Sequence, residues 1–390
     1  MKMIRVGFIH ESFPFGGGEK VTSNLAAFFA DKNVRTYVFA CRLQPSSDPD
    51  IQFCKFPDSR KVNTKANMDY LIQVAGELDL DILILPGVYL KDIKTLRQKI
   101  KAKFVFALHS KPMWEAINKY IIVEERSYQS WSKRIKWLLV QRPKYRLLNT
   151  HTKSFLNLYK RTFKFVDAYV VLCESYKYEL LDLLKTDNVS KLLAIPNSVD
   201  TAPDIDLSVK QKEIIFVGRL SYADKRVDRL LDIWQGLCLK YPDWKLRIIG
   251  DGPELSALKN KVLEDDLKNV IFEGYHQNVV PFYRNASVIC MTSSFEGWPL
   301  VLGEAQSYGV VPVAFNCSAG VADILSPDGV NGILVPPFDM ELYTKQLGRL
   351  MSDDQLRLKI AEAVILKSKE YSPDIIGKKW LDLFQTLTSK

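Results

Sequence analysis

One stretch, Ser293 to Gly309, constrains the fold of this chain more than any other. Apolar, strand-like runs flank it at residues 288–291 and 310–315, whereas the pattern between them is helical. We expect Pro299 at the first helical position, where its missing N–H costs nothing, and Gly309 in the left-handed conformation that closes a helix. The stretch therefore predicts a strand, a loop, a helix and a second strand of a parallel sheet.

Two carboxylates stand in this stretch, Glu296 in the predicted loop and Glu304 on the second helical turn. Ligands of open α/β sheets bind outside the carboxyl ends of the strands, beside the N-termini of helices. We therefore expect a phosphate to meet the backbone of Trp298, Pro299 and Leu300, with both glutamates in reach of hydroxyl groups on the same ligand. The alternative is an ordinary strand–helix–strand unit whose glutamates face the solvent.

The alternation of strands and helices extends over the whole chain of 390 residues. A first series of strand-like runs covers 4–9, 35–40, 81–85, 103–108, 168–172 and 192–195, and a second covers 213–217, 245–249, 269–273, 288–291 and 311–315. This alternation predicts doubly wound parallel sheets, and the length suits two domains. The polar stretch Thr201–Gln211, which contains Pro203, is the predicted interdomain linker.

Residues suited to anion binding follow several of these strands. The run Gly16-Gly17-Gly18 forms a turn into a helix, where backbone amides can approach an anion closely. His109 directly follows the strand at 103–108, and its alternative role is to cap a neighbouring helix. Arg219 and Lys225 follow the strand at 213–217, where two cations can neutralise charge that develops on a leaving phosphate. The alternative for this pair is two surface cations without a ligand.

Taken in order, these motifs resemble family 4 of the retaining, nucleotide-sugar glycosyltransferases. The resemblance covers nearly the whole chain and is strongest from Gly218 to Gly332. It rests on the turn at 16–19, on 196–200, on Gly-Arg-Leu at 218–220 with Lys225, and on the two glutamates eight positions apart. The chain departs from the family at Ser198 and Arg226, where Gly is usual, and at 318–320, where Ser-Ala-Gly replaces Ser-Gly-Gly.

The resemblance implies an α/β protein of the GT-B class, with two Rossmann-like, doubly wound parallel-sheet domains that face each other across a cleft. Residues 1–200 would form the acceptor-side domain, 212–371 the nucleotide-sugar domain, and 372–390 a helix that crosses back to the first. In the implied roles, Arg219 and Lys225 stabilise the departing diphosphate, Glu296 orients the donor sugar, and His109 lies near the donor sugar and the acceptor. The implied donor-binding residues are Gly16, Gly17, Gly18, Tyr275, His276, Trp298, Pro299, Leu300 and Glu304.

The implied function is a metal-independent, retaining transfer of a hexose from a nucleotide sugar, with a UDP-sugar expected. The acceptor would be a saccharide or a lipid-linked saccharide in the synthesis of cell-envelope polysaccharide or glycolipid. No cofactor besides the donor substrate is expected. Two alternatives stay open: a GT-B sugar-nucleotide epimerase, which needs extra carboxylates for proton abstraction beside the sugar, and a non-catalytic partner subunit that keeps the fold.

Composition narrows the setting in which such a protein works. The six cysteines are scattered without a Cys-x-x-Cys pair, and the four histidines form no His-x-x-x-His pair, so we expect free thiols and no metal site. No apolar run approaches the roughly 20 residues of a membrane span, and the N-terminus lacks the pattern of a signal peptide. These observations predict a cytoplasmic protein, and we expect no nucleic-acid partner.

The net charge of +9 is concentrated in one segment. Residues 126–166 hold eleven Lys or Arg and no Asp or Glu, and aromatic residues interleave with these cations: Trp131, Trp137, Tyr145, Phe155, Tyr159 and Phe163. Basic amphipathic helices with Trp on the apolar side are typical of interfacial membrane binders. We expect peripheral attachment to the inner face of a membrane. The alternatives are ordinary helices with solvated basic faces and a site for an anionic soluble glycan.

Overall fold

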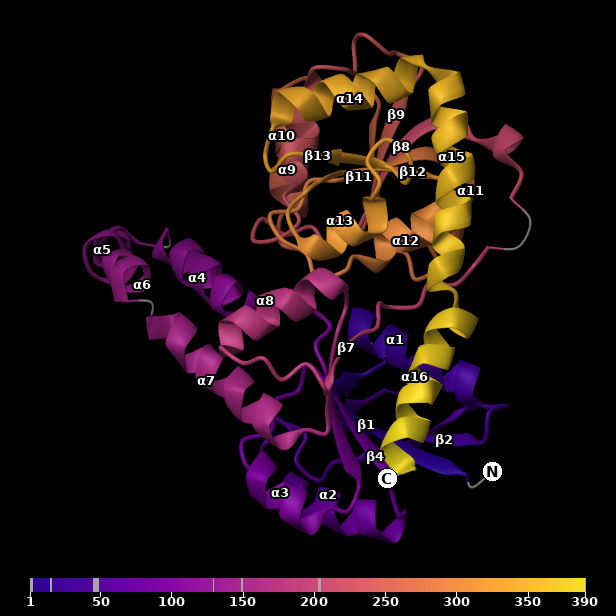
Figure 1. Cartoon of the computed structure of the whole chain (residues 1–390). Helices are drawn as coiled ribbons and strands as arrows, with labels where there is room; N and C mark the ends of the chain where they lie inside the picture. Colours follow the sequence, from indigo (N-terminus) through magenta and orange to yellow (C-terminus); the bar gives the residue numbers. More distant parts are fainter. Residues whose placement is uncertain are drawn as a thin grey trace. The chain divides into compact units, whose positions relative to one another are not determined.

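The computed structural model describes residues 3–14, 16–44, 49–128, 130–148, 150–202 and 205–389, so the linker residue Pro203 lies outside the described residues. Two compact units divide the chain (Figure 1): unit 1 comprises Met1–Ser198 and Pro373–Lys390, and unit 2 comprises Val199–Ser372. The assignment of one unit to the acceptor and the other to the donor, across a shared cleft, stays a prediction.

Unit 1 is built on a seven-stranded parallel sheet with the order β3-β2-β1-β4-β5-β6-β7. Its central strand β4 is an apolar run that is buried from Ile82 to Leu85, as expected for a strand covered on both faces. The edge strand β3 was not predicted, because its short sequence IQFCK is only partly buried and carries little pattern. The strands are β1 (Ile4–Phe13), β2 (Val34–Leu43), β3 (Ile51–Lys55), β4 (Ile82–Pro86), β5 (Lys103–Ala107), β6 (Ala168–Val171) and β7 (Leu192–Ala194).

Helices α1 (Gly17–Phe29), α2 (Lys65–Glu77), α3 (Ile93–Lys99) and α8 (Glu174–Leu184) cover this sheet together with the C-terminal helix α16 (Pro373–Thr388). Helix α16 packs on α1, and the rings of Phe29 and Phe384 lie 5.2 Å apart. Close packing also needs Gly377, because a Cβ there would lie 2.3 Å from the ring of Phe28. The last segment of the chain is thus a structural part of unit 1.

A helical arm extends from unit 1, at the left of Figure 1. Helices α4 (Trp114–Ser127) and α7 (Thr150–Phe165) contact each other, and the chain between them forms α5 (Trp131–Lys136), the π-helix η1 (Trp137–Gln141) and α6 (Arg142–Leu148). The division predicted at Pro143 falls where η1 gives way to α6. Pro143 lies in the first turn of α6, where proline is tolerated.

Unit 2 contains a six-stranded parallel sheet with the order β10-β9-β8-β11-β12-β13. Its strands are β8 (Gln211–Val217), β9 (Lys245–Ile249), β10 (Val270–Gly274), β11 (Ala286–Met291), β12 (Val311–Phe315) and the short β13 (Ile333–Val335), which was not predicted. Its helices are η2 (Leu207–Val209), α9 (Val227–Gln235), α10 (Leu255–Glu264), α11 (Val280–Asn285), α12 (Leu300–Ser307), α13 (Ala319–Leu325), α14 (Met340–Ser352), α15 (Asp354–Ser368) and η3 (Lys369–Tyr371).

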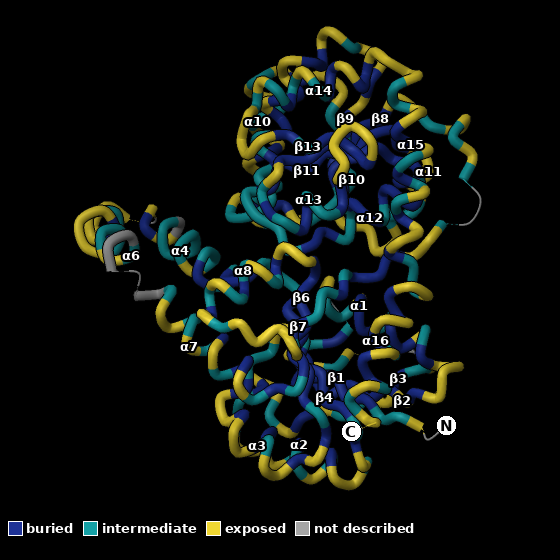
Figure 2. Tube along the Cα trace, in the orientation of Figure 1, coloured by how far each residue is buried: buried dark blue, intermediate teal, exposed yellow. Residues whose placement is uncertain are grey.

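The hydrophobic core of unit 2 contains buried side chains from both the sheet and the helices that pack on it. Trp234 of α9, Trp244 before β9 and Tyr343 of α14 are fully buried among the strand side chains. In both units most strands are dark blue in Figure 2, except the edge strands β3 and β10, and many of the exposed residues lie on helices and loops. The prediction of two Rossmann-like domains with doubly wound parallel sheets is therefore confirmed. Rigid parallel strands fix the loops at their carboxyl ends, where most of the predicted site residues lie.

Candidate functional site

Two loops at the carboxyl ends of neighbouring strands β8 and β11 are held together in unit 2. The ammonium group of Lys225 donates to Oε1 of Glu296 at 2.7 Å, and the hydroxyl group of Ser293 donates to the same oxygen at 2.7 Å. The amide of Ser294 donates to the carbonyl oxygen of Asp224 at 2.7 Å. Burial alone would lower the pKa of Lys225, but the ion pair with Glu296 outweighs it and the pKa is raised. The structure thus brings Lys225 and Glu296 together as one charged pair.

Arg219 lies on the same loop after β8 as Lys225, and its side chain is more exposed than that of Lys225. Its guanidinium group donates to Oδ2 of Asp224 at 3.0 Å, while two thirds (66%) of its side chain is exposed. Asp224 thus orients Arg219 from the same loop that carries Lys225. Exposure leaves the guanidinium group accessible to an anion at the strand ends, and its planar donors suit a phosphate.

Arg226, which replaces a usual glycine of the family, takes the left-handed conformation that glycine favours (φ 51°). Its guanidinium group makes a bidentate ion pair with Asp228 and lies 4.2 Å from the ring centre of Tyr222. Its carbonyl oxygen accepts a hydrogen bond from Thr292 at 2.9 Å. These contacts stabilise Arg226 in a conformation that favours glycine, and they hold the turn that positions the neighbouring Lys225.

The expectation for Pro299 was wrong by one position. Pro299 is extended and caps α12, which begins at Leu300, because the loop before the helix stays extended through the proline. Proline has no N–H, so it contributes no phosphate donor. The first-turn amides of Leu300 and Val301 have no intrahelical acceptor, and they are the donors this helix end offers. Gly309 does take the predicted left-handed conformation (φ 69°) after α12.

Helix α13 presses on the loop that carries Glu296. A Cβ on Gly320 would lie 1.8 Å from the carbonyl oxygen of Gly297, so only glycine fits at this position. Ser318 caps α13 by accepting from the amide of Val321. The buried Trp298 donates to Asp323 at 3.2 Å and packs edge-on against the ring of Tyr371. Trp298 therefore anchors the loop by its side chain instead of facing a ligand.

Glu304 is held by a residue that sequence reasoning missed. The hydroxyl group of Tyr283 in α11 donates to Oε2 of Glu304 at 3.0 Å, and its ring stacks on Tyr308 with 5.9 Å between centres. Burial, and then the charge of Glu304, raises the pKa of Tyr283 well above its usual value, so it stays a donor. No local pattern signals this role for Tyr283, since an aromatic residue in an amphipathic helix is usually a core residue.

Tyr275 and His276 follow strand β10 in unit 2. Tyr275 is largely exposed, whereas the imidazole of His276 lies 3.2 Å from the carbonyl oxygen of Glu273 and packs edge-on against Phe282. Both residues lie at the same sheet edge as Arg219 and Lys225. Their role beside a nucleoside base stays a prediction.

The predicted residues of unit 1 form a second cluster. His109, just beyond the end of β5, pairs through Nδ1 with Oδ1 of Asn197 at 3.1 Å, which gives Nδ1 the proton and leaves Nε2 as an acceptor. Burial lowers the pKa of His109. The partner is thus an asparagine from the turn at 196–200, and not the end of a helix as in the alternative role. Asn197 was not among the predicted site residues, although its motif was recognised.

His10 and Glu19 join this cluster, and neither was predicted. Burial, with a smaller contribution from His109, lowers the pKa of His10 to about 3. Its Nε2 lies 3.0 Å from the hydroxyl group of Thr22, and its Nδ1 lies 3.8 Å from Oε1 of Glu19. Burial raises the pKa of Glu19. The signal available in the sequence was a histidine directly after the apolar run at 4–9.

The predicted Gly-rich turn leads into α1 beside these side chains. Gly16 caps α1 with φ 122°, a conformation that disfavours other residues, and a Cβ there would meet Glu19 at 2.3 Å. Gly17 and Gly18 already belong to the first turn of α1. The turn therefore presents helix-end amides and places Glu19 toward His10.

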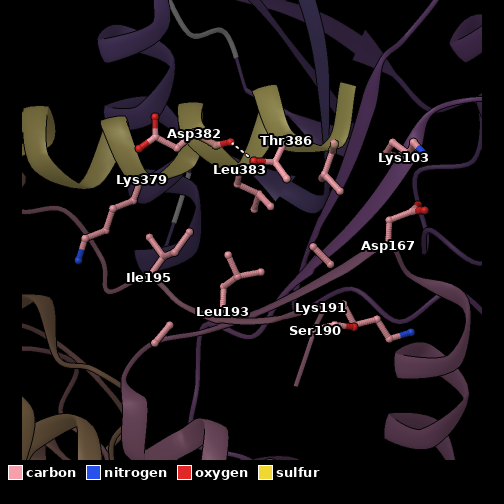
Figure 3. A pocket seen from close by; sticks show the side chains of 13 residues that line it. Lys103, Asp167, Ser190, Lys191, Leu193, Ile195, Lys379, Asp382, Leu383 and Thr386 are labelled. Atoms are coloured by element: carbon pink, nitrogen blue, oxygen red, sulfur yellow. Dashed lines mark hydrogen bonds between the residues drawn. The ribbon is translucent and has the colours of Figure 1, made fainter. Parts of the chain in front are cut away.

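A cavity of ≈ 530 Å³ in unit 1 lies at the amino ends of β5 and β6 and along the edge strand β7 (Figure 3). Lys103 and Asp167 at the amino ends of β5 and β6 line it, together with Lys379 and Asp382 of α16. The carboxylate of Asp167 is already bound by the guanidinium group of Arg97 at 2.7 Å. The cavity holds none of the predicted site residues, and the strand-end rule places the site at the carboxyl ends of the strands.

The arrangement in unit 2 suits an anion that carries hydroxyl groups. Lys225, Arg219 and the N-terminus of α12 supply positive charge, while Glu296 and Glu304 can accept hydrogen bonds from hydroxyl groups. Over the described ranges, no three His, Cys, Asp or Glu side chains are placed to hold a metal ion. The chemistry that these side chains offer is electrostatic stabilisation of a phosphate, with carboxylates to orient a sugar.

The fold and this site define a protein of the GT-B class. The solved structure of Anabaena Alr3699/HepE in complex with UDP-glucose matches with a TM-score of 0.72 and 17% identity, over 98% of this chain and 100% of that chain. At this identity the likeness concerns the fold alone. It confirms the predicted fold class.

Within this class, residues 200–366 match the family described as glycosyl transferases group 1. The amylovoran biosynthesis glycosyltransferase AmsD of Erwinia amylovora is 38% identical over 188 residues, which are 48% of this chain and 52% of that protein. The lipopolysaccharide 1,6-galactosyltransferase of Salmonella typhimurium is 31% identical over 150 residues, 37% of this chain and 41% of that protein. The chain spans about half the length of these curated relatives. The family predicted from the motifs is confirmed.

Proposed function

We propose that the protein is a retaining glycosyltransferase that moves a hexose from a nucleoside diphosphate donor, with UDP as the nucleotide, to a saccharide or lipid-linked saccharide. The observation that carries this proposal is the pair of Lys225 and Glu296 beside Arg219. A cation set for a diphosphate and a carboxylate for sugar hydroxyl groups stand at the same strand ends. The names of the relatives support an acceptor in envelope polysaccharide or lipopolysaccharide synthesis.

In the proposed reaction the bond between the sugar carbon C1 and the diphosphate oxygen breaks while a bond from C1 to an acceptor oxygen forms on the same face. The acceptor proton passes to the leaving phosphate oxygen, so no protein nucleophile is needed. Arg219, Lys225 and the first-turn amides of α12 stabilise the charge on the leaving diphosphate. Glu304, held by Tyr283, accepts from the ribose, and Glu296 orients the donor sugar.

The unit 1 cluster has the groups for contacts with the donor sugar and the acceptor. His109 keeps an acceptor nitrogen, Nε2, because Nδ1 pairs with Asn197. Its lowered pKa keeps the ring neutral near pH 7, so it can accept a hydrogen bond from a hydroxyl group. We propose this role for His109.

The test is release of nucleoside diphosphate that depends on a saccharide acceptor. Donors are first screened by thermal shift, UDP-sugars before others, and the product is then identified by mass and by the anomeric configuration in NMR spectra. A product with the anomeric configuration of the donor supports the proposal. An epimerised nucleotide sugar without any acceptor would identify the epimerase, whereas absence of binding by every donor would favour a non-catalytic partner subunit.

We further propose that the protein acts at the inner face of a membrane, where a lipid-linked or envelope acceptor is met. The basic segment 126–166, with eleven cations and no acid, supports this location. Each Lys or Arg near an anionic bilayer contributes about 1 kcal/mol of attraction.

A further inference from the structure

A row of apolar side chains is exposed at the far end of the helical arm. Trp131 is 82% exposed, Leu139 is 73% exposed and Val140 is 56% exposed. Six of the 19 exposed large apolar residues among the described residues lie within 128–140, and we call these six the apolar tip: Tyr128, Trp131, Ile135, Leu138, Leu139 and Val140. Contiguous exposed apolar patches mark interaction sites, whereas scattered ones do not.

The tip residues have helical spacing, and the apolar helix face that they form is exposed to solvent instead of packing on the protein. Trp131, Ile135, Leu138 and Leu139 follow the i, i+4, i+7, i+8 pattern of an amphipathic helix. The opposite side is the one that packs, since Trp137 is fully buried and its ring meets Tyr120 at 5.2 Å and Tyr145 at 5.9 Å. The aromatic cluster fixes the orientation of α5 and η1, so the tip is held away from the core.

Cations surround the apolar tip. Residues 126–145 contain Arg126, Lys133, Arg134, Lys136, Arg142 and Lys144, without any acid. The guanidinium group of Arg134 lies 4.0 Å from the ring centre of Tyr128 and donates to the hydroxyl group of Ser127 at 3.1 Å. An apolar patch with a basic rim is the composition of an interfacial binder of anionic lipid.

The structure shows that, among its described residues, only part of the segment 126–166 offers exposed aromatic residues for a contact with lipid. Of the six interleaved aromatic residues, Trp137, Tyr159 and Phe163 are buried, and Tyr159 donates to Glu115 inside the arm. Trp131 is the one of these six that is classed as exposed. Helix α7 therefore turns Tyr159 and Phe163 inward, and the apolar part of any lipid contact falls on α5 and η1.

We propose that the apolar tip inserts into the headgroup region of an anionic bilayer, with its basic rim on the lipid phosphates. This inference deepens the membrane part of the proposed function and rests on it. A second copy of the chain is a poor occupant, since two tips would bring like charges together at an apolar contact. Among the described residues no helix combines the length and apolarity of a membrane span, so we propose contact from one side only.

The probe is a vesicle of phosphatidylcholine with roughly one third phosphatidylglycerol, added to the full-length protein in a flotation assay at low salt. The test variant is Trp131→Gln with Leu139→Gln, which removes apolar area and leaves the charge unchanged. The matched control is Leu239→Gln with Leu263→Gln, because these residues are 77% and 79% exposed in unit 2. A charge variant, with Lys133, Arg134 and Lys136 changed to Glu, tests the basic rim.

We expect the test variant to lose about tenfold or more in vesicle partitioning, since two large side chains leave the lipid, and the control to bind as wild type. The charge variant should bind less, and binding should fall as salt rises. All seven tryptophans lie in the described part of the chain, and Trp131 alone is classed as exposed, so a blue shift of emission with vesicles should vanish in Trp131→Phe.

The proposal would be overturned if the variant with Trp131→Gln and Leu139→Gln partitioned onto vesicles as strongly as the wild type. It would also be overturned if the wild-type protein did not bind these vesicles. Binding of a soluble anionic glycan that depends on the three cations, but not on the apolar tip, would also overturn it and assign the segment to the glycan. None of these readouts uses sugar transfer. Failure here therefore leaves the transferase proposal to its own test of acceptor-dependent diphosphate release.

Discussion

At the scale of single residues, the ion pair of Lys225 and Glu296 makes the first prediction. Changing Arg219 or Lys225 to Ala should lower turnover about 10²–10³-fold, the size observed when one preorganised donor to a transition-state charge is lost. Steady-state rates of diphosphate release check this, with the melting temperature as a control for folding. Near-normal turnover in a folded double variant would remove both cations from the mechanism.

Lys225→Ala also removes the cation beside the largely buried Glu296, which keeps the hydrogen bond from Ser293, so its effect is more than the loss of one phosphate contact. The single and double changes of Lys225 and Glu296 to Ala should therefore be non-additive in stability and in rate. Arg219, which is largely exposed, should show a small change in melting temperature and a large change in rate.

The second prediction separates the two glutamates. Glu304→Ala should weaken binding of the bare nucleoside diphosphate by about 1.5–3 kcal/mol, since a charged hydrogen bond is lost, whereas Glu296→Ala should mainly impair positioning of the sugar. Tyr283→Phe removes the 3.0 Å hydrogen bond to Glu304 and should weaken the same binding by about 0.5–1.5 kcal/mol. Titration calorimetry measures all three. The assignment fails if Glu296→Ala weakens diphosphate binding more than Glu304→Ala does.

The third prediction concerns pH and His10. The pKa of His10 is about 3 in the fold and about 6.5 in an unfolded chain, so the unfolded state binds more protons between these values. Its contribution to stability is complete above about pH 6.5 and is lost as the pH falls toward 3, by at most about 1.4 kcal/mol per pH unit. The raised pKa of Glu19 acts in the opposite direction.

Thermal unfolding between pH 7 and pH 4 tests the sign of this effect. Wild type should lose stability on acidification, and His10→Gln should lose less, because the buried imidazole is gone. Parallel curves for the two proteins would show that His10 does not carry the pH dependence.

At the scale of elements, the contact of α13 with the Glu296 loop makes the fourth prediction. Gly320→Ala places a Cβ 1.8 Å from the carbonyl oxygen of Gly297, so either the helix or the loop must move. We expect a loss of stability of about 1–3 kcal/mol, as in other overpacked sites, together with weaker donor binding. Ala319→Gly, at the adjacent position, is the matched control and should retain donor binding. A normal melting temperature and normal affinity in Gly320→Ala would contradict this.

The elements also show how far sequence reasoning reached. The buried strands β4, β5, β11 and β12 were predicted from apolar runs, because a strand covered on both faces carries the strongest pattern. The edge strand β3 was missed because its sequence IQFCK is only partly buried and carries little pattern. The edge strand β13 is apolar and mostly buried, but its three residues are too short a run to indicate a strand. The start of α12 was misplaced by one residue, as helix bounds often are.

Some residues of the candidate site could be predicted from the sequence in the same way, but their contacts could not. Lys225 and Glu296 each belong to a motif, but they lie 71 positions apart, and the sequence does not show that they pair. Tyr283, Asn197 and His10 act through tertiary contacts that no local pattern records. Burial of Trp137, Tyr159 and Phe163 likewise depends on how the arm packs, and composition alone could not distinguish them from Trp131.

At the scale of the whole molecule, the last prediction is that sugar transfer continues in excess chelator. A diphosphate leaving group needs positive charge, and a divalent metal is the common source of it. Here Lys225 and Arg219 stand at the strand ends beside the N-terminus of α12, and these groups suit the same role. Transfer should therefore proceed in EDTA at a rate close to that without it, whereas the Lys225→Ala protein should be slow in either condition. Loss of wild-type transfer in EDTA, restored by Mg²⁺ or Mn²⁺ alone, would show that a metal supplies this charge and that the cationic pair does not suffice.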